Sequence, residues 1–231
     1  MEPTVSWRIS GTQAVSQGGR LHCEVDVAKP SQGLENVQLG DSRFSNWSLL
    51  RTKLPGGIGT EPVAEHYVRG NDLIVTYKQT PNRTVRPQLC WRAGAASTEL
   101  IVSVQTSLLE SCPAICVGSR LVDGEAYSLD GESCQQITNA CEIPTSAILF
   151  RPNGGSVSYL ELVHPSDANL VRIEFSADQV ETQFEIFNDR LEKGVIRRGR
   201  LRSHFIDRAS DVDSAIELMR EFQASPAPLT T

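Results

Sequence analysis

Apolar and polar residues alternate along the stretch from Ser156 to Phe222, and this alternation constrains the fold more than any other feature of the chain. Successive side chains of a β-strand point to opposite faces, so a period of two predicts strands. We predict four strands in succession, at 158–164, 170–176, 182–188 and 195–206. Short connections between them favour one antiparallel meander.

The predicted meander has an apolar face and a polar face. The apolar face would be formed by Leu160, Leu162, Val171, Ile173, Phe175, Phe184, Ile186, Val195, Leu201 and Phe205. The opposite face would carry Tyr159, Glu161, Arg172, Glu174, Gln183, Glu185, Arg198, Arg200, Arg202 and His204. We expect the first set to pack into the core and the second to face solvent, as is common in antiparallel sheets.

Only the end of the chain has helical spacing. One apolar stripe is formed by Val212, Ala215, Ile216, Met219 and Phe222. Ser210, followed three residues later by Asp213, predicts a capping box at the helix start. We expect a helix over about 211–223 that packs on the strands.

Turn signals divide the rest of the chain into further strands. Gly70-Asn71-Asp72, for example, predicts a hairpin between 64–69 and 73–79. No linker and no internal repeat divides the chain convincingly. The sequence therefore predicts a mainly β fold: one large antiparallel β-sandwich domain over 1–231, resembling a supersandwich, with the C-terminal helix packed on it.

Composition sets limits on partners and compartment. The chain has 231 residues and a formal net charge of −6, which argues against a general nucleic-acid binder. No apolar run approaches the roughly 20 residues of a membrane helix, so we expect no membrane partner. Met1-Glu2-Pro3-Thr4 has neither a basic nor an apolar leader region. If this is the native start, a cytoplasmic location is expected.

Arginines concentrate near the end of the chain. Between Arg190 and Arg208, seven basic residues stand against two acidic ones in an otherwise acidic protein. Guanidinium groups suit carboxylate, phosphate and sulfate. We therefore predict an anion or acidic-sugar site with the ligand-binding residues Arg172, Arg198, Arg200 and Arg202.

The same arginines have a structural interpretation, which the sequence favours. Glu161, Glu174 and Glu185 fall on the same predicted face of neighbouring strands, so the charges could form a cross-strand ladder. A bulge at Gly199 would also move Arg198 off that face.

The six cysteines and the three tryptophans give no clear chemical site. Cys23 alternates with apolar residues and is most simply a buried free thiol. Cys112 and Cys116 have a gap of three residues, whereas the gap of six between Cys134 and Cys141 is loose for structural zinc. Disulfides are left open, and we predict no metal and no cofactor. Core positions are expected for Trp7, Trp47 and Trp91, with stacking on sugar rings as the alternative.

The histidines are scattered, and no catalytic motif is present. His66 and His164 could each act as a general base beside a carboxylate, but a lone histidine is more often an ordinary polar residue. The sequence has no glycine-rich phosphate loop, no G-x-S-x-G and no H-E-x-x-H. If the protein is an enzyme, the sequence does not identify its catalytic residues.

Two resemblances add to this interpretation. The stretch that runs from Glu192-Lys193-Gly194-Val195-Ile196-Arg197-Arg198 through Arg200-Leu201-Arg202 to Pro228-Leu229-Thr230-Thr231 resembles a family of uncharacterised bacterial proteins, which implies no activity. The many long antiparallel strands resemble the supersandwich of galactose mutarotase-like proteins in architecture. No histidine–glutamate set of that family can be carried over to this chain.

Three functional hypotheses follow. The leading one is a binder of a carbohydrate or an anionic small molecule, with an unpaired arginine surface. The second is a sugar-modifying enzyme of the aldose epimerase or lyase type, in which histidine and glutamate converge in a pocket. The third is a structural protein that self-associates into a homo-oligomer through a sheet face.

Overall fold

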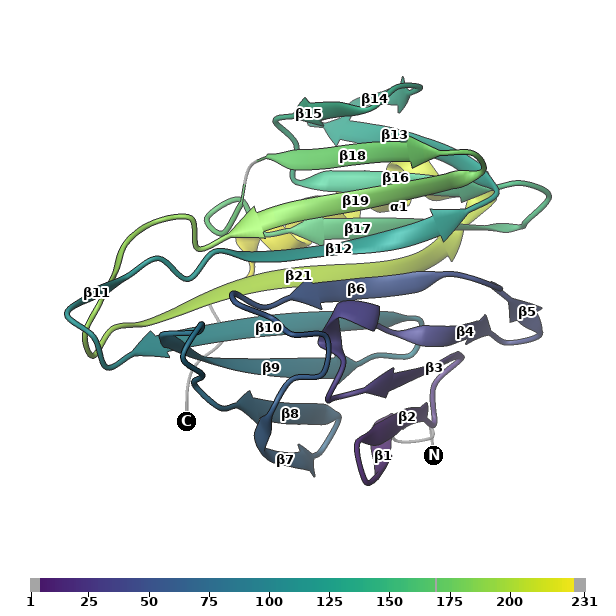
Figure 1. Ribbon diagram of the computed structural model, residues 1–231. Helices are drawn as coiled ribbons and strands as arrows, with labels where there is room; N and C mark the ends of the chain where they lie inside the picture. The colour runs from purple at the N-terminus through teal and green to yellow at the C-terminus, as the bar shows by residue number, and fades with distance from the viewer. Residues whose placement is uncertain (1–4, 169, 227–231) are drawn as a thin grey trace.

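The computed structural model describes residues 5–168 and 170–226. Met1–Thr4, on which the expectation about a leader rested, and Pro228–Thr231, which belong to the stretch that resembles the bacterial family, lie outside the described residues. The described chain folds into two layers of antiparallel sheet with one α-helix at its end (Figure 1). This confirms the predicted mainly β fold, a large β-sandwich with a C-terminal helix.

One layer is a nine-stranded sheet in the order β14-β13-β16-β17-β21-β10-β9-β8-β7. In that order the strands span Ser133–Ile137, Gly124–Asp130, Ala147–Pro152, Val157–Val163, Ile196–Asp207, Ser97–Thr106, Val85–Ala93, Asp72–Tyr77 and Val63–Arg69. Strand β21, which carries most of the clustered arginines, is the middle strand of the nine. The predicted hairpin around Gly70 is confirmed as β7 and β8.

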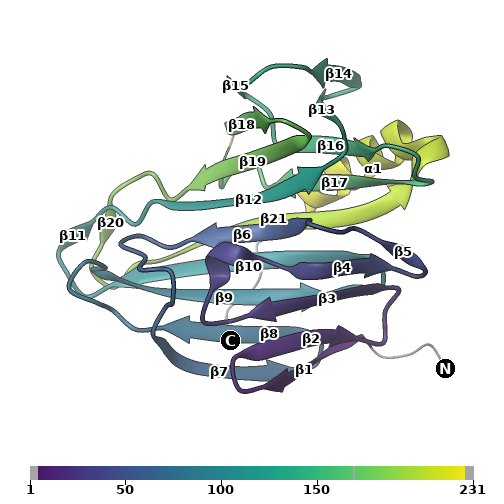
Figure 2. The ribbon, with the colours of Figure 1, turned by 45° about the vertical axis from the view of Figure 1, so that its right-hand side comes forward.

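The facing layer contains two five-stranded sheets, which Figure 2 shows side by side in front of the nine-stranded sheet. Strands β15, β18, β19, β12 and β6 span Cys141–Ile143, Val171–Ser176, Gln179–Ile186, Ile115–Val122 and Ser48–Lys53. Strands β1 to β5 span Ser6–Ser10, Gln13–Gln17, Leu21–Asp26, Glu35–Leu39 and Ser42–Arg43. An antiparallel bridge between Leu34 and Leu49 links the two sheets.

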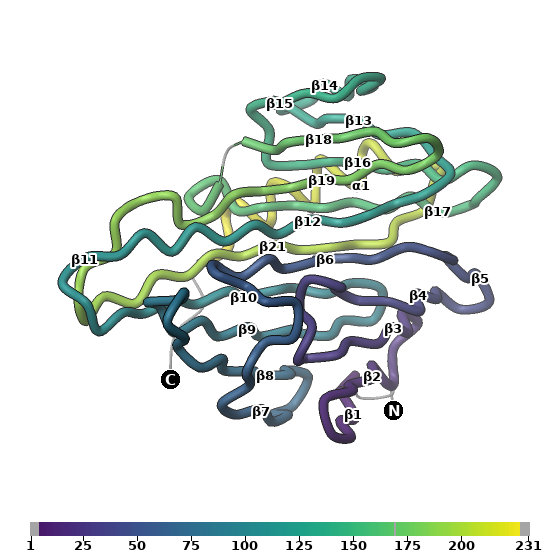
Figure 3. The backbone as a smooth tube through the Cα atoms, in the orientation of Figure 1, coloured from purple at the N-terminus to yellow at the C-terminus, as the bar shows by residue number. Residues whose placement is uncertain are grey.

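The remaining elements are short. Strands β11, Glu110–Ser111, and β20, Leu191–Glu192, pair with each other beyond one end of the sandwich. Two 3₁₀ helices span Pro30–Gln32 and Arg208–Ser210. The backbone tube in Figure 3 shows that β13, β14, β16 and β17 occupy one end of the nine-stranded sheet, with β21 between them and β10.

The expected single meander is wrong. Strands β18 and β19 pair with each other, but they belong to the facing layer, whereas β17 pairs directly with β21 in the nine-stranded sheet. The chain therefore leaves one layer after β17 and returns to it only at β21. Local alternation sets which residues form strands, but it carries no information about which layer a strand joins.

The predicted faces of β17 are also reversed. Tyr159 and Glu161 point between the two layers, while Leu160 and Leu162 pack against the C-terminal helix. Both faces of this strand are covered, and all of its residues from Ser158 onward are buried. A strand covered on both sides does not need to alternate, which removes the signal that the prediction used.

A polar cluster joins the two layers inside the core. The Glu161 side chain is fully buried, and it accepts hydrogen bonds from Ser119 Oγ at 2.8 Å and Thr182 Oγ1 at 2.5 Å. The Tyr159 hydroxyl lies 3.0 Å from the same Ser119 oxygen. Burial raises the pKa of Glu161 to about 7, against the opposing effect of the two hydroxyl hydrogen bonds. A buried carboxyl here is satisfied by hydroxyls, not by a cation.

Helix α1, Asp211–Ala224, covers part of the outer face of the nine-stranded sheet, as predicted for 211–223. Its start differs from the expected capping box, because the Ser210 side chain makes no capping hydrogen bond. Asp211 instead forms a bidentate ion pair with Arg151, at 2.8 and 2.9 Å, and accepts from Ser158 Oγ at 2.6 Å. Burial alone would raise the pKa of Asp211, but these contacts outweigh it and lower the pKa, and they fix the helix N-terminus to the sheet.

The predictions for the three tryptophans and for Cys23 are confirmed. The side chains of Trp7, Trp47 and Trp91 are buried in the core, and Cys23 is a buried free thiol. Burial raises the pKa of Cys23 to about 12, so the thiol stays protonated.

Candidate functional site

The outer face of the nine-stranded sheet is covered unevenly. Helix α1 packs over β13, β16 and β17 through a separate apolar cluster that includes Leu149, Leu160, Met219 and Phe222. In the described part of the chain, no helix covers β10, β9 and β8. The side chains on this open half form rows across the strands, because the register between neighbouring strands is regular.

One row is a ladder of alternating charge, which we call the ladder row: Arg202, Glu99, Arg92 and Asp72 on β21, β10, β9 and β8. Arg92 donates to Asp72 at 2.8 and 3.1 Å, and it lies 3.4 Å from Glu99. Arg202 Nε is 3.2 Å from Glu99. The hydrogen bond to Asp72 raises the pKa of Arg92, opposing the effect of burial. Every charge in this row has a partner of opposite sign.

Arg200, two residues before Arg202, is buried, with only 5% of its surface exposed. Its guanidinium donates to Ser225 Oγ at 3.1 Å and to the Pro226 carbonyl at 2.8 Å, and it lies over the Phe222 ring. Arg202 lies over the same ring, 4.5 Å from its centroid. These contacts hold the end of helix α1 against β21.

Arg198 lies two residues further along, and its surroundings are different. Its row continues through Ser103, Gln88 and Thr76, which bring hydroxyl and amide groups and no acid. In the part of the chain that the structure describes, its guanidinium forms no hydrogen bond and no ion pair. No bulge occurs at Gly199, because the β10–β21 register is continuous there.

A pocket of about 240 Å³ opens beside Arg198. Its lining, which we call the arginine pocket, consists of Thr76, Arg86, Gln88, Ser103, Val104, Gln105, Ile196 and Arg198. Arg86, on β9, is the second cation, and it too has no ion pair among the described residues. The two arginines stand on the strands that flank β10, and the register offsets them by two residues, because Arg86 aligns with Gln105 and Ile196. Two strand spacings and this offset separate their backbones by roughly 12 Å. Long side chains can converge across that distance on one small ligand.

Arg172 does not belong to this surface. It lies on β18 in the facing layer, exposed, and pairs with Glu142 at 2.5 Å. The expectation that Arg172, Arg198, Arg200 and Arg202 share one face is therefore wrong, because β18 and β21 belong to different layers. Sequence reasoning missed Arg86. Its only signal is the regular alternation of β9, which places Arg86 and Gln88 on the same face.

The chemistry of the arginine pocket is that of recognition. Two guanidinium groups offer forked donors to a carboxylate or phosphate. Gln88 and Gln105 offer amides, and Thr76 and Ser103 offer hydroxyls, which can donate to or accept from sugar hydroxyls. The lining residues include no histidine, no carboxylate and no cysteine. The pocket can hold a ligand but brings no general base of its own.

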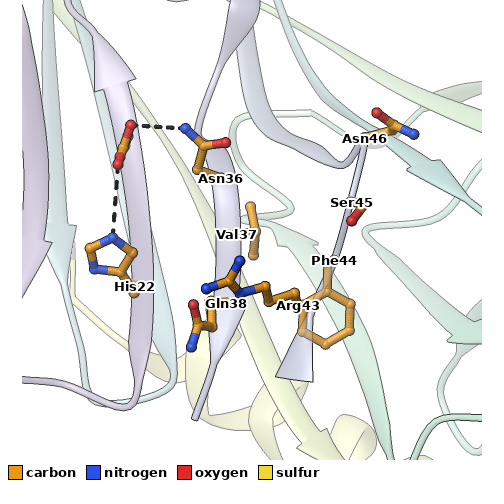
Figure 4. A pocket seen from close by; sticks show the side chains of 9 residues that line it. His22, Asn36, Val37, Gln38, Arg43, Phe44, Ser45 and Asn46 are labelled. Carbon is orange, nitrogen blue, oxygen red and sulfur yellow. Dashed lines mark hydrogen bonds and ion pairs between the residues drawn. The ribbon is translucent and has the colours of Figure 1, made fainter. Parts of the chain in front are cut away.

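Histidine and glutamate approach each other elsewhere. His22 Nε2 lies 3.9 Å from Glu24 Oε1 in a pocket on β3 and β4, and Asn36 donates to the other Glu24 oxygen at 2.9 Å (Figure 4). The distance between His22 and Glu24 exceeds a hydrogen bond. His66 is exposed on β7, and His164 contacts Ser166 Oγ and the Gln223 carbonyl.

The described residues contain neither a membrane-spanning helix nor a metal-binding cluster. No helix among them is long and apolar enough to cross a membrane. They also contain no group of three or more histidine, cysteine, aspartate or glutamate side chains placed to hold a metal ion.

No protein-family model matches the sequence, and no curated protein matches it either. Solved structures do match. A galactose mutarotase-like protein from Clostridium acetobutylicum superposes with a TM-score of 0.60 at 6% identity, covering 89% of this chain and 99% of that one. An Escherichia coli K12 protein provisionally assigned as an aldose 1-epimerase gives 0.59 at 7%, covering 88% and 99%. A galactose mutarotase related enzyme from Lactobacillus acidophilus gives 0.58 at 9%, covering 84% and 97%. The chain therefore has the fold of the galactose mutarotase-like proteins.

Proposed function

We propose that this protein binds a carbohydrate that carries an anionic group, and that the arginine pocket is its binding site. The observation that carries the proposal is the pair Arg86 and Arg198. Both line one pocket, neither has an ion-pair partner among the described residues, and no acidic residue lines the pocket. A charged group without a counter-ion beside a polar pocket is what an anion site requires.

The neutral side chains of the pocket narrow the ligand class. Gln88 Nε2 donates to Thr76 Oγ1 at 3.1 Å, which leaves the Gln88 carbonyl oxygen free to accept. Gln105 and Ser103 stand between the two arginines in the register. Neutral donors and acceptors beside a cationic pair suit a uronic acid or a sugar phosphate better than a bare inorganic ion. The structural neighbours named as sugar enzymes support a sugar ligand on this fold.

Ligand roles for Arg172, Arg200 and Arg202 stay predictions. Each of them already has a partner within the chain: Glu142, the end of helix α1, and Glu99. The proposal therefore assigns the anion contact to Arg198, which the sequence singled out, and adds Arg86.

The test compares tri-galacturonic acid with neutral galactotriose by isothermal titration calorimetry. We expect the acidic trimer to bind more tightly. A charge-assisted hydrogen bond contributes about 1.5–3 kcal/mol, so Arg86→Gln and Arg198→Gln should each weaken the acidic trimer by about tenfold or more. Inorganic phosphate should compete, and added salt should weaken binding.

Arg172→Gln is the matched control, because it removes an exposed arginine of the other layer. It should leave the affinity unchanged. Equal affinity for the acidic and neutral trimers, or equal losses in all three variants, would contradict the arginine pocket as an anion site.

A catalytic role is the second candidate, since the structural neighbours include epimerase-type proteins. The observation in its favour is the approach of His22 to Glu24, at 3.9 Å in a pocket. Both side chains are about half exposed, and neither lines the arginine pocket. Binding is therefore the better supported function of the two.

A further inference from the structure

The turn from Arg43 to Asn46 joins strand β5 to strand β6 and has a pocket on either side of it. The first pocket, of about 320 Å³, lies against β3 and β4 and is the one shown in Figure 4. The second, of about 490 Å³, lies against the segments around Asp123 and Asn153. Both are lined by the same four turn residues, 43–46, so the two pockets meet over this turn.

An aromatic ring forms part of the wall that the pockets share. Phe44 is half-buried, and its ring lies 4.6 Å from that of Trp47 and 5.0 Å from that of Phe205, centroid to centroid. Trp47 is itself fixed by an indole hydrogen bond to the Val122 carbonyl at 3.2 Å. A ring held rigidly at the edge of the core offers an apolar surface to the C–H face of a sugar.

The polar groups around Phe44 are mixed in sign and largely unengaged. The side chains of Arg43, Ser45 and Asn46 are exposed and make no hydrogen bond with the described residues. Glu24 faces them in the first pocket, held by Asn36. In the second pocket Asp123 accepts from Asn153 at 2.8 Å, and Asp178 lies beside them. The lining around the ring therefore contains both donors and acceptors.

The charge balance here is the opposite of that in the arginine pocket. Arg43 is offset by Glu24 on one side and outnumbered by Asp123 and Asp178 on the other. An anionic ligand would be repelled by the excess of carboxylates, whereas neutral hydroxyls can pair with every group present.

We infer that the two pockets form one groove across residues 43–46 that binds a neutral oligosaccharide, with Phe44 under a sugar ring and Arg43 and Asn46 donating to its hydroxyls. This is a second site, at the edge of the sandwich where residues 43–46 meet the turn between β16 and β17, and it does not depend on the arginine pocket. Two adjoining pockets imply more than one sugar unit, so affinity should grow with chain length.

The backbone of the turn provides a clean variant. Asn46 has a φ of 65°, in the left-handed region where glycine is unstrained. Asn46→Gly therefore removes the side-chain amide and keeps the turn. Arg43→Gln removes the cation from an exposed position. Arg8→Gln, an exposed arginine of β1 that lines neither pocket, is the matched control.

The experiment measures binding of cellohexaose, maltohexaose and chitohexaose, and of the corresponding disaccharides, by saturation-transfer NMR and calorimetry on the full chain. We expect at least one hexasaccharide to bind more tightly than its disaccharide. Asn46→Gly and Arg43→Gln should each weaken it severalfold or more, while Arg8→Gln and the pair Arg86→Gln with Arg198→Gln should have no effect.

Three results would overturn the inference. They are no binding of any hexasaccharide at millimolar concentration, binding that Asn46→Gly and Arg43→Gln leave unchanged, and binding that is lost only in the Arg86 and Arg198 variants. The last result would move the sugar to the arginine pocket and would leave the proposed function standing.

Discussion

The ladder row and the row of Arg198 lie on the same face of the same strands, four residues apart along β21, yet they treat charge in opposite ways. In the ladder row Glu99 and Asp72 neutralise Arg202 and Arg92. In the other row Ser103, Gln88 and Thr76 stand where those partners would be. Whether an arginine of β21 is ion-paired or free for a ligand is therefore set by its cross-strand neighbours, not by its position in a basic stretch.

The energetic reason is the cost of leaving charge without a partner. An arginine on a sheet face is stabilised by a carboxylate opposite it, and the pair contributes modestly to the fold. Arg198 has no carboxylate opposite it, so its guanidinium N–H groups stay available to a ligand. A half-buried cation without a counter-ion beside a pocket is a feature of binding sites. The ligand then supplies the ion pair that the chain lacks.

The inner face of the same sheet provides a second contrast, between its Glu161 and Glu99 of the ladder row. Of the variants considered, we expect substitution of Glu161 to change the free energy of unfolding most. Glu161 is a buried carboxyl without a cation, whereas Glu99 has two. The pKa of Glu161 is raised from 4.5 to about 7, so its contribution to stability is fully present below pH 4.5 and is lost as the pH rises through 7. The loss is on the order of 3 kcal/mol, at 1.36 kcal/mol per pKa unit. Glu161→Gln should abolish this pH-dependent loss of stability, so the variant should be more stable than the wild type at pH 8.

Urea unfolding at several pH values between 4.5 and 8 provides the measurement. His204 works in the other direction, because burial, with a smaller effect of Arg202, lowers its pKa from 6.5 to about 4. Its contribution is present above pH 6.5 and is lost as the pH falls through 4. The two effects offset each other in the wild type, so Glu161→Gln should reveal a stability that rises with pH. Parallel curves for the two proteins would contradict the assignment.

A smaller loss is expected when the ladder row is broken. Glu99→Gln removes the acceptor that Arg92 and Arg202 share, whose side chain is only 9% exposed. We expect a loss of about 2 kcal/mol, because the arginines are partly exposed and recover some hydration. The midpoint of urea unfolding measures it. Glu142→Gln, which breaks the exposed pair with Arg172, is the control and should cost less than about 0.5 kcal/mol.

Binding measurements on Glu99→Gln separate the ladder row from the arginine pocket. Affinity for tri-galacturonic acid should be unchanged in Glu99→Gln, because the ladder row lies outside the arginine pocket. A loss of affinity as large as that of Arg198→Gln would show that the two rows work as one site.

The positions of helix α1 and of several strands were predictable from the sequence, but the pairing between strands was not. The spacing of Ala215, Met219 and Phe222 predicts helix α1 to within a residue or two, since a 3.6 period needs only near neighbours. The same reasoning finds β17 and β21 but cannot see that they pair with each other across more than thirty intervening residues. It also assigns Glu161 to solvent, because burial of a carboxyl depends on hydroxyls from Ser119 and Thr182 in the other layer.

The candidate site shows the same division. The basic stretch pointed to Arg198, but only the register of β9, β10 and β21 brings Arg86 to the same pocket. Nothing in the local sequence separates Arg198 from Arg202. The difference arises from Glu99 and Ser103 on β10, about a hundred residues away along the chain.

The smallest effect on stability, and the sharpest test of the comparison, comes from converting one row into the other. Ser103 faces Arg198 across the β10–β21 pair, so Ser103→Glu would place a carboxylate where Glu99 stands in the ladder row. A cross-strand ion pair contributes roughly 0.2–1 kcal/mol, and we expect a gain of that size in the free energy of unfolding. Binding of tri-galacturonic acid should fall by tenfold or more, because the new carboxylate occupies the guanidinium and repels the ligand. Ser103→Gln, of similar size and neutral, should retain most of the affinity. If both variants lose binding equally, bulk at this position explains the loss, and the charge of Arg198 does not.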